Sequence, residues 1–429
     1  MGCPSLRRYE GWLWLVLLLA VSRLGAAQPA QGHAFQLAKP GQRQVSFPFA
    51  IQRNLIVVSA RLNGHGPYNF LLDTGVSTSI ITDPLVADSL HLVRGTEYRI
   101  GGVGGQEGGL RAYETTGVRV ELPGVVAPRL TWLVLSSDVL DLSGYAGTPI
   151  HGLLGAELFQ SLVVAIHSQQ GRLVCYDPTR YRAPKGRRWS AIPLDIDHNK
   201  AYLTAEISQL STLAAASSLP LRLVLDTGAG HALSLETSAD RRLHLPATRL
   251  RTDLGRGLTG LVSGYLGRVA SVQLGRYHLP QVLTSFPDST QVHERLPPSE
   301  RSRQGNLGYE VLKRFEVVID YPHKRLLLRA TNMLREPFEH DMCGLDLLAC
   351  GPRFRRYLVQ RVVPESPAAA AAISEGDELL FINLVAAPDL SINDISRLLH
   401  SQNGRLVFLV VRRANGDLYS TTIHLRRQI

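Results

Sequence analysis

Cysteine is scarce in this sequence: the 429 residues contain four, and no two of them form a Cys-x-x-Cys pair. A zinc site or a thioredoxin-like redox motif therefore has no support, and the zinc motif His-Glu-x-x-His is also missing. We expect neither a metal nor a cofactor. Cys343 and Cys350 are expected either to form a disulfide in an oxidising compartment or to be buried free thiols.

Charged residues are also few, at 19% of the sequence, whereas 45% is hydrophobic. This balance suits two or three globular domains with apolar cores and excludes a disordered chain. The net charge of +10 comes mostly from arginines scattered over expected loops such as residues 180–188 and 299–304. Because no basic stripe with interleaved aromatic residues occurs, we expect no nucleic acid partner.

Long apolar runs are missing beyond the N-terminus. The first residues carry two arginines at positions 7 and 8, an apolar core over residues 12–21, and small residues at positions 25–27. This pattern is typical of a secretory signal peptide, residues 1–27, with an apolar core shorter than the roughly 20 residues of a spanning helix. We therefore expect an exported protein, periplasmic or extracellular. The alternative is an uncleaved segment that tethers the chain to a membrane.

An internal repeat is the main feature that is present. The stretch "PYNFLLDTGVS" recurs as "PLRLVLDTGAG", so that Asp226 follows Asp73 at an offset of 153 residues (226 − 73). Further on, "HGLLGAELF" recurs as "GNLGYEVL", and Gly155 matches Gly308 at the same offset. A register held over nearly a hundred residues indicates a duplicated unit.

Each copy is expected to be a mainly β lobe, over residues 45–180 and 188–330. Alternating or continuous apolar runs such as "NLIVVSARL", "LVVAIHS" and "EVVIDY" read as strands, and glycine and proline turns separate them. One short helix per lobe is expected, at residues 156–162 and 309–315. An arginine-rich connector joins the two lobes.

The repeated Asp-Thr-Gly places a carboxylate directly after an apolar strand, where it costs free energy unless something satisfies it. Ordinary turn chemistry is one explanation. If the lobes pack about a pseudo-twofold axis, however, Asp73 and Asp226 meet, and two adjacent carboxylates hold one proton between them. The ionised member can then take a proton from water while the other protonates a scissile carbonyl.

The neighbouring residues suit this arrangement. The hydroxyls of Thr74 and Thr227 can tie the two loops together across the axis. Gly75 and Gly228 let backbone N–H groups turn toward the carboxylates. The four residues are therefore expected to support the aspartate pair.

Together these motifs resemble the retropepsin-like aspartic proteases in a single-chain, two-lobed form, over about residues 45–330. The resemblance implies a cleft across both lobes and a glycine-rich flap hairpin in each. The candidate flap residues are Gly102, Gly104, Gly105, Gly255, Gly257 and Gly260.

Two positions depart from the pattern of this family. Asn306 is polar where the family has an apolar residue before glycine, and His167 stands where the second copy has Asp320. Competing signals are poorer: "GRGLTG" matches a dinucleotide fingerprint without a following helix, and a Ser-His-Asp triad stays open but lacks a G-x-S-x-G elbow.

The last part of the chain, residues 343–429, has a different pattern of strand, short helix, strand, amphipathic helix and closing hairpin. It resembles a bacterial PDZ domain, with Ser366, Pro367, Gly376 and Asp377 at that family's Ser-Pro-Ala and Gly-Asp positions. We therefore expect a small α+β domain.

This second resemblance implies a groove where a peptide adds as an extra strand. The family's carboxylate-binding loop would lie near Gly344, Leu345 and Leu347. The alternative is a structural end-cap with an empty groove.

The sequence thus predicts an exported aspartic endopeptidase that acts on protein or peptide substrates, with a PDZ-like domain that aids peptide or partner recognition. The alternative is a peptide-binding protein of the same fold with little or no catalysis. Residues 335–342 look like a polar linker, so a core of about residues 34–335 is expected to fold alone.

Overall fold

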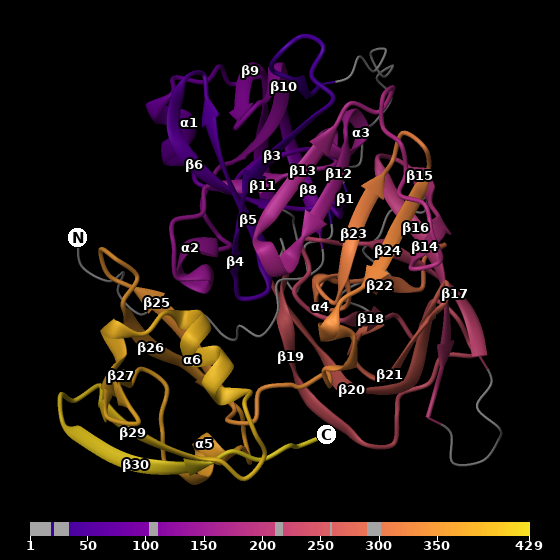
Figure 1. Ribbon diagram of the computed structural model, residues 1–429. Coiled ribbons are helices and arrows are strands. Elements are labelled where there is room, and N and C mark those ends of the chain that lie inside the picture. Colours follow the sequence, from indigo (N-terminus) through magenta and orange to yellow (C-terminus); the bar gives the residue numbers. More distant parts are fainter. Residues whose placement is uncertain (1–18, 21–33, 103–109, 211–217, 258–259, 290–301) are drawn as a thin grey trace.

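The computed structural model describes residues 19–20, 34–102, 110–210, 218–257, 260–289 and 302–429. The expected signal peptide, residues 1–27, lies outside this part of the chain except for its residues 19–20. Two β lobes lie side by side, and the C-terminal domain contacts both (Figure 1). Within the described ranges, no helix has the length and apolar character needed to cross a membrane.

The sheet of lobe 1 has the strand order β1-β8-β9-β10-β7-β11-β6-β5-β4, with β2 also paired to β10. Apolar residues alternate along strands that bury one face and run continuously along strands that bury both faces. The strands are β1 (Leu19–Ala20), β2 (Gln36–Leu37), β4 (Ala50–Gln52), β5 (Leu55–Leu62), β6 (His65–Leu72), β7 (Ile80–Ile81), β8 (Glu97–Gly102), β9 (Leu110–Leu122), β10 (Val125–Leu135) and β11 (Gly152–Leu154).

The sheet of lobe 2 has the order β15-β16-β17-β22-β18-β21-β20-β19, which repeats lobe 1 from β4 to β8 strand for strand. The repeat is also visible in the register, since Leu153 pairs with Leu71 and Asn306 with Val224. The strands are β15 (Asp195–Asp197), β16 (Lys200–Ser208), β17 (Ser218–Leu225), β18 (Leu233–Leu235), β19 (Arg249–Gly257), β20 (Gly260–Leu274), β21 (Tyr277–Pro287) and β22 (Gly305–Leu307).

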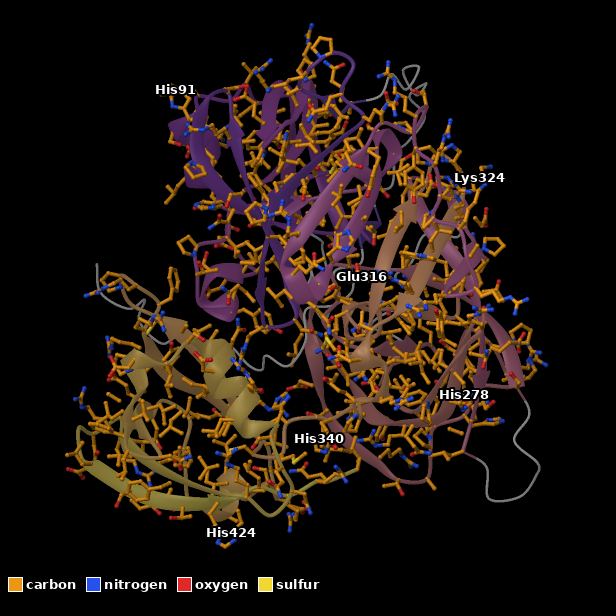
Figure 2. The ribbon with its side chains drawn as sticks, viewed as in Figure 1. His91, His278, Glu316, Lys324, His340 and His424 are labelled. Atoms are coloured by element: carbon orange, nitrogen blue, oxygen red, sulfur yellow. The ribbon has the colours of Figure 1, made fainter. Side chains whose placement is uncertain are left out.

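A third sheet joins the lobes, with the order β14-β24-β23-β12-β13-β3. The central pair β12 and β23 crosses the lobe boundary, and His167 is paired there with Glu316. Figure 2 labels Glu316. The Nδ1 atom of His167 is in hydrogen-bonding contact with the Glu316 carboxylate, so this departure from the family pattern serves the interface. The strands are β3 (Gln44–Pro48), β12 (Val163–His167), β13 (Arg172–Tyr176), β14 (Trp189–Pro193), β23 (Phe315–Asp320) and β24 (Arg325–Ala330).

The helices are short. The two expected ones are α3 (Glu157–Ser161) and α4 (Tyr309–Leu312), and lobe 1 adds α1 (Pro84–Ser89) and α2 (Leu142–Ala146). An aspartate side chain caps each additional helix, because Asp83 accepts from the N–H of Leu85 and Asp141 from that of Gly144. Single 3₁₀ turns occur at η1 (Ser168–Gln170), η5 (Asn332–Arg335) and η6 (Ala387–Asp389).

The segment that the sequence presents as a polar linker is packed against lobe 2. Phe338 is buried in the core shared by the lobes. The guanidinium of Arg314 lies 3.6 Å from the centroid of that ring and donates to the carbonyls of Met333 and Pro337. A core ending at residue 335 therefore excludes a side chain that lobe 2 buries.

The C-terminal domain has its own core and a sheet in the order β25-β26-β27-β29-β30, with β28 paired to β27. Its main helix begins with a capping box between Ser391 and Asp394. Cys343 and Cys350 are both buried, and no disulfide joins them. The elements are β25 (Leu345–Cys350), β26 (Arg356–Val362), α5 (Pro367–Ala370), β27 (Glu378–Ile382), β28 (Val385–Ala386), α6 (Ile392–Leu399), β29 (Leu406–Arg412) and β30 (Leu418–His424).

Candidate active site

The two Asp-Thr-Gly loops meet at the lobe boundary. Each aspartate ends a buried strand, β6 or β17, and its backbone N–H continues the parallel pairing with the next strand. Asp73 donates to the carbonyl of Leu154 at 2.9 Å, and Asp226 donates to that of Leu307 at 3.0 Å. Both aspartate side chains are completely buried.

The two threonines cross-link the loops. The N–H of Thr74 donates to Oγ1 of Thr227 at 3.1 Å, and the N–H of Thr227 donates to Oγ1 of Thr74 at 3.0 Å. Each hydroxyl then donates to a carbonyl of the opposite lobe, Thr74 to Leu225 and Thr227 to Leu72. Because every donor in this set has a partner, the two loops are held in one geometry.

The glycines bring the carboxyl groups close to the opposite loop. A Cβ atom on Gly228 would lie 2.1 Å from Cγ of Asp73, and one on Gly75 would lie 3.0 Å from Cγ of Asp226. The N–H of Gly75 also donates to Oδ1 of Asp73 at 2.7 Å. Each aspartate therefore occupies space that only glycine leaves open.

Asn306 binds the second aspartate. Its Nδ2 donates to Oδ2 of Asp226 at 2.8 Å, and its Oδ1 lies 3.1 Å from Nε2 of His231. Burial lowers the pKa of His231 to about 4, so the ring is neutral and Nε2 donates to the amide oxygen. The polar residue that departs from the family pattern thus contacts the aspartate pair directly.

One oxygen of each carboxyl group is buried without a hydrogen bond. Within the ranges that the structure describes, Oδ2 of Asp73 and Oδ1 of Asp226 have no hydrogen-bond partner. The other oxygen of each group is held, by Gly75 or by Asn306. Asp73 and Asp226 interact with each other directly, and this interaction contributes to the raised pKa of Asp73.

The electrostatics of the two aspartates differ. Burial raises the pKa of Asp73 well above its ordinary value, and the charge of Asp226 raises it further. Burial also raises the pKa of Asp226, to about 6, against the hydrogen bond from Asn306 and the charges of Arg303 and Lys200. The hydrogen bond from Asn306 and the charge of Arg303 thus favour the ionised form at Asp226.

The two cations near the pair were not identified from the sequence. Arg303 is fully buried and pairs with Glu236 at 2.9 Å. Lys200 is also fully buried, and its charge lowers the pKa of both aspartates. In the upstream part of the repeat, where the offset is 145, Lys200 matches Leu55 (200 − 145). A charged residue at a position that is apolar in the other copy could have indicated Lys200 from the sequence.

The described flap candidates lie in two equivalent antiparallel strand pairs. Gly102 ends β8, which pairs with β9. Gly255, Gly257 and Gly260 lie in the pair β19–β20, which we call the lobe 2 flap hairpin. Gly255 and Gly260 have φ angles of +142° and +124°, which favour glycine. Gly104 and Gly105 lie outside the described residues.

The expected groove residues of the C-terminal domain lie at the start of its edge strand. Leu345 and Leu347 turn their side chains into the domain core. Gly344 has a φ of +81°, and a Cβ there would lie 2.2 Å from Cβ of Ser366. These residues thus offer their backbone rather than their side chains to a partner.

Comparisons with known proteins agree with this architecture. A family model described as aspartyl protease matches residues 58–158 and 213–311, and one described as PDZ domain matches residues 358–413. Each lobe therefore matches an aspartyl protease domain, and the C-terminal domain matches a PDZ domain.

Solved structures with local or overall likeness include the aspartic proteinase from Irpex lacteus, at 15% identity over 68% of this chain and 99% of that chain, with a TM-score of 0.39. The photosystem II D1 C-terminal processing protease is 24% identical over 20% of this chain and 23% of that chain, with a TM-score of 0.19. No curated protein matches the chain.

Proposed function

We propose that this protein is an aspartic endopeptidase in which Asp73 and Asp226 hydrolyse peptide bonds by activating a water molecule. One observation supports the proposal: each lobe contributes one buried carboxyl group, in which one oxygen accepts a hydrogen bond and the other has none among the described residues. Carboxyl groups arranged in this way share a proton, which provides a base and an acid at the same site.

The different surroundings of the aspartates assign their roles. Asp226 is ionised and takes a proton from the water, whose oxygen attacks the scissile carbonyl carbon. Asp73 is protonated and gives its proton to the carbonyl oxygen, so a neutral tetrahedral diol forms. Asp226 then gives its proton to the amide nitrogen, and Asp73 takes a proton from a hydroxyl of the diol as the C–N bond breaks. The products are an amine and a carboxylic acid, and the pair again holds one proton.

A catalytically weak peptide-binding protein is the second candidate. The complete burial of both carboxyl groups favours it, because a substrate reaches them only after the covering residues move. The geometry of the pair favours hydrolysis, since a site that only binds gains nothing from two adjacent buried acids, which cost free energy.

Digestion of casein and of a peptide library at pH values from acidic to alkaline separates these candidates. We expect cleavage that a statine-type inhibitor blocks, since its hydroxyl replaces the attacking water, and that EDTA does not affect. Peptide binding without cleavage at every pH would favour the second candidate. Cleavage that EDTA abolishes would overturn the proposed mechanism.

We also propose that the chain is exported, as residues 1–27 predict. N-terminal sequencing of protein recovered from the periplasm or the medium tests this proposal. We expect a mature N-terminus near residue 28. A membrane-bound chain that still begins at Met1 would instead support an uncleaved tether.

A further inference from the structure

β25 is one of the two terminal strands of the PDZ sheet. Among the described residues, β26 is its one strand partner, so its other edge is left free by the sheet. α6 packs beside it, and both contribute side chains to the domain core. An extended peptide that adds to a PDZ domain uses such an edge, next to the helix.

In this structure a segment of lobe 1 lies between β25 and α6. It consists of α2 and the glycine that follows it, residues 142–147, and Figure 1 shows α2 next to β25. A Cβ on Gly147 would lie 2.7 Å from Cγ2 of Ile392 in α6 and 3.7 Å from Cβ of Ala349 in β25. Lobe 1 thus enters the groove where a peptide would bind.

Polar contacts fix this segment and the neighbouring β4–β5 turn in place. Nη1 of Arg53 donates to the carbonyl of Leu347 in β25 at 3.2 Å, while its guanidinium lies 4.9 Å from the ring of Tyr145 in α2. Asn393 in α6 donates to the carbonyl of Ile51 at 2.8 Å and accepts from the N–H of Arg53 at 2.7 Å. Both walls of the groove are therefore bonded to lobe 1.

A carboxylate of the same chain binds the backbone N–H groups of the loop before β25. The carboxylate of Asp341 accepts from the N–H of Cys343 at 3.1 Å and from that of Gly344 at 2.5 Å. These N–H groups belong to the loop that would capture the terminal carboxylate of a peptide. An internal carboxylate therefore competes with an external one.

The strand beside β25 contacts the lobe 2 flap hairpin. Arg361 in β26 forms an ion pair with Asp253 in β19, and both side chains are largely buried. The domain thus connects lobe 1, through its groove, with a strand of lobe 2 that belongs to the flap.

We propose that the groove of the PDZ domain is an intramolecular docking surface whose ligand is lobe 1, namely residues 142–147 and the β4–β5 turn. A free peptide binds there only when it displaces lobe 1. Because the same domain holds Asp253, displacement also releases the lobe 2 flap hairpin. The docking itself does not depend on the proposed proteolytic function, whereas an effect on activity does.

The first test is hydrogen exchange on the full-length chain with Gly147→Asn. Asparagine tolerates a positive φ, so the end of α2 is retained, while its side chain collides with Ile392. We expect exchange of residues 345–350 to become about tenfold faster or more, because their cover is lost. Gly64→Asn is the matched control, since Gly64 also has a positive φ but no atom lies within 4 Å of its Cβ position.

Gly147→Asn could disturb lobe 1 itself, so a second variant tests the docking with a substitution in the PDZ domain. Asn393→Ala removes the bonds from α6 to the β4–β5 turn, and Arg397→Ala on the exposed side of the same helix is its control. Faster exchange of residues 345–350 in Asn393→Ala but not in Arg397→Ala supports docking. Unchanged exchange in both Gly147→Asn and Asn393→Ala overturns it.

A peptide that copies residues 138–150 provides a direct probe of the groove. We expect it to bind the Gly147→Asn chain at least tenfold more tightly than the wild type, where lobe 1 competes. Equal binding to both chains overturns the docking proposal.

Hydrogen exchange of β19 reports on the lobe 2 flap hairpin. If exchange of residues 345–350 becomes faster and exchange of β19 does not change, the coupling to the flap is overturned and the docking stands. Neither readout requires catalysis, so failure of the proposed function would not be mistaken for failure of the docking.

Discussion

Lobe 1 and lobe 2 have the same strand order and the same Asp-Thr-Gly loop, but they surround their aspartates differently. β22 in lobe 2 supplies Asn306 to Asp226, whereas the matching position of β11 in lobe 1 is Leu153. The symmetry of the fold thus places the two carboxyl groups, and a single polar residue makes their hydrogen bonding differ.

The turns before the first long strand of each lobe also share a backbone shape but make different contacts. Both are tight turns with two residues at positive φ, Arg53 and Asn54 in lobe 1, His198 and Asn199 in lobe 2. The lobe 2 turn accepts a hydrogen bond from the hydroxyl of Ser77 across the lobe boundary. The lobe 1 turn contacts the PDZ domain as well. A duplicated scaffold therefore carries separate uses in its two copies.

The strongest test of the shared scaffold is removal of the carboxyl charges. We expect Asp73→Asn and Asp226→Asn each to lower kcat/KM by about 10³-fold or more, because one water needs both groups. The double variant should be hardly slower than either single variant, since the pair acts as a unit. Steady-state kinetics on one peptide measures this, with thermal unfolding as the control for folding. A single variant that keeps most of the wild-type rate would refute the pair as the catalyst.

The glycines test whether the two loops are equally tight. A Cβ on Gly228 would lie 2.1 Å from Asp73, whereas one on Gly75 would lie 3.0 Å from Asp226. We therefore expect Gly228→Ala to lower kcat by about ten- to a hundredfold, the cost of an overpacked site, and Gly75→Ala to lower it much less. Both variants should unfold cooperatively. Equal losses would show that the close approach is symmetric.

The asymmetric hydrogen bond is tested by Asn306→Leu, which gives lobe 2 the residue of lobe 1. The bond from Asn306 favours the ionised form of Asp226, so its removal raises the pKa of that carboxyl group further. The acid limb of the activity profile should move to higher pH by about one unit, as expected for a lost bond to a charged group. A pH–rate profile measures the shift, and Leu153→Met in lobe 1 is the control. An unmoved acid limb would contradict the assignment of Asp226 as the base.

Much of the fold was accessible from the sequence, because strands and turns are local patterns. The apolar runs and the offset of 153 predicted the strands of both lobes and the helices α3 and α4. The helices α1 and α2 were missed, since five or six residues are too short to show helical periodicity. The sheet that joins the lobes rests on the pairing of β12 with β23, which no local pattern reveals.

The site was only partly accessible for a related reason. The repeat indicated which two aspartates occupy equivalent positions, but the charge around them comes from other strands. Asn306 was noticed only as a departure from the family pattern, and its hydrogen bond to Asp226 depends on how β22 lies beside β17. The docking of the PDZ groove on lobe 1 is a tertiary contact over some two hundred residues and has no signature in either segment alone.

Lys200, which has Leu55 as its counterpart in lobe 1, is expected to have the smallest of these effects on the aspartate pair. Its charge lowers the pKa of both aspartates, unlike the bond from Asn306, which acts on Asp226 alone. In Lys200→Met both pKa values should rise, so the acid limb and the alkaline limb of the profile should move to higher pH together. We expect a shift of less than about one unit, because several effects on each aspartate exceed that of Lys200. Leu55→Met, the matched change in lobe 1, should leave both limbs in place. If Lys200→Met moves only the acid limb, its charge acts on one aspartate, and the pair is even less symmetric than the structure indicates.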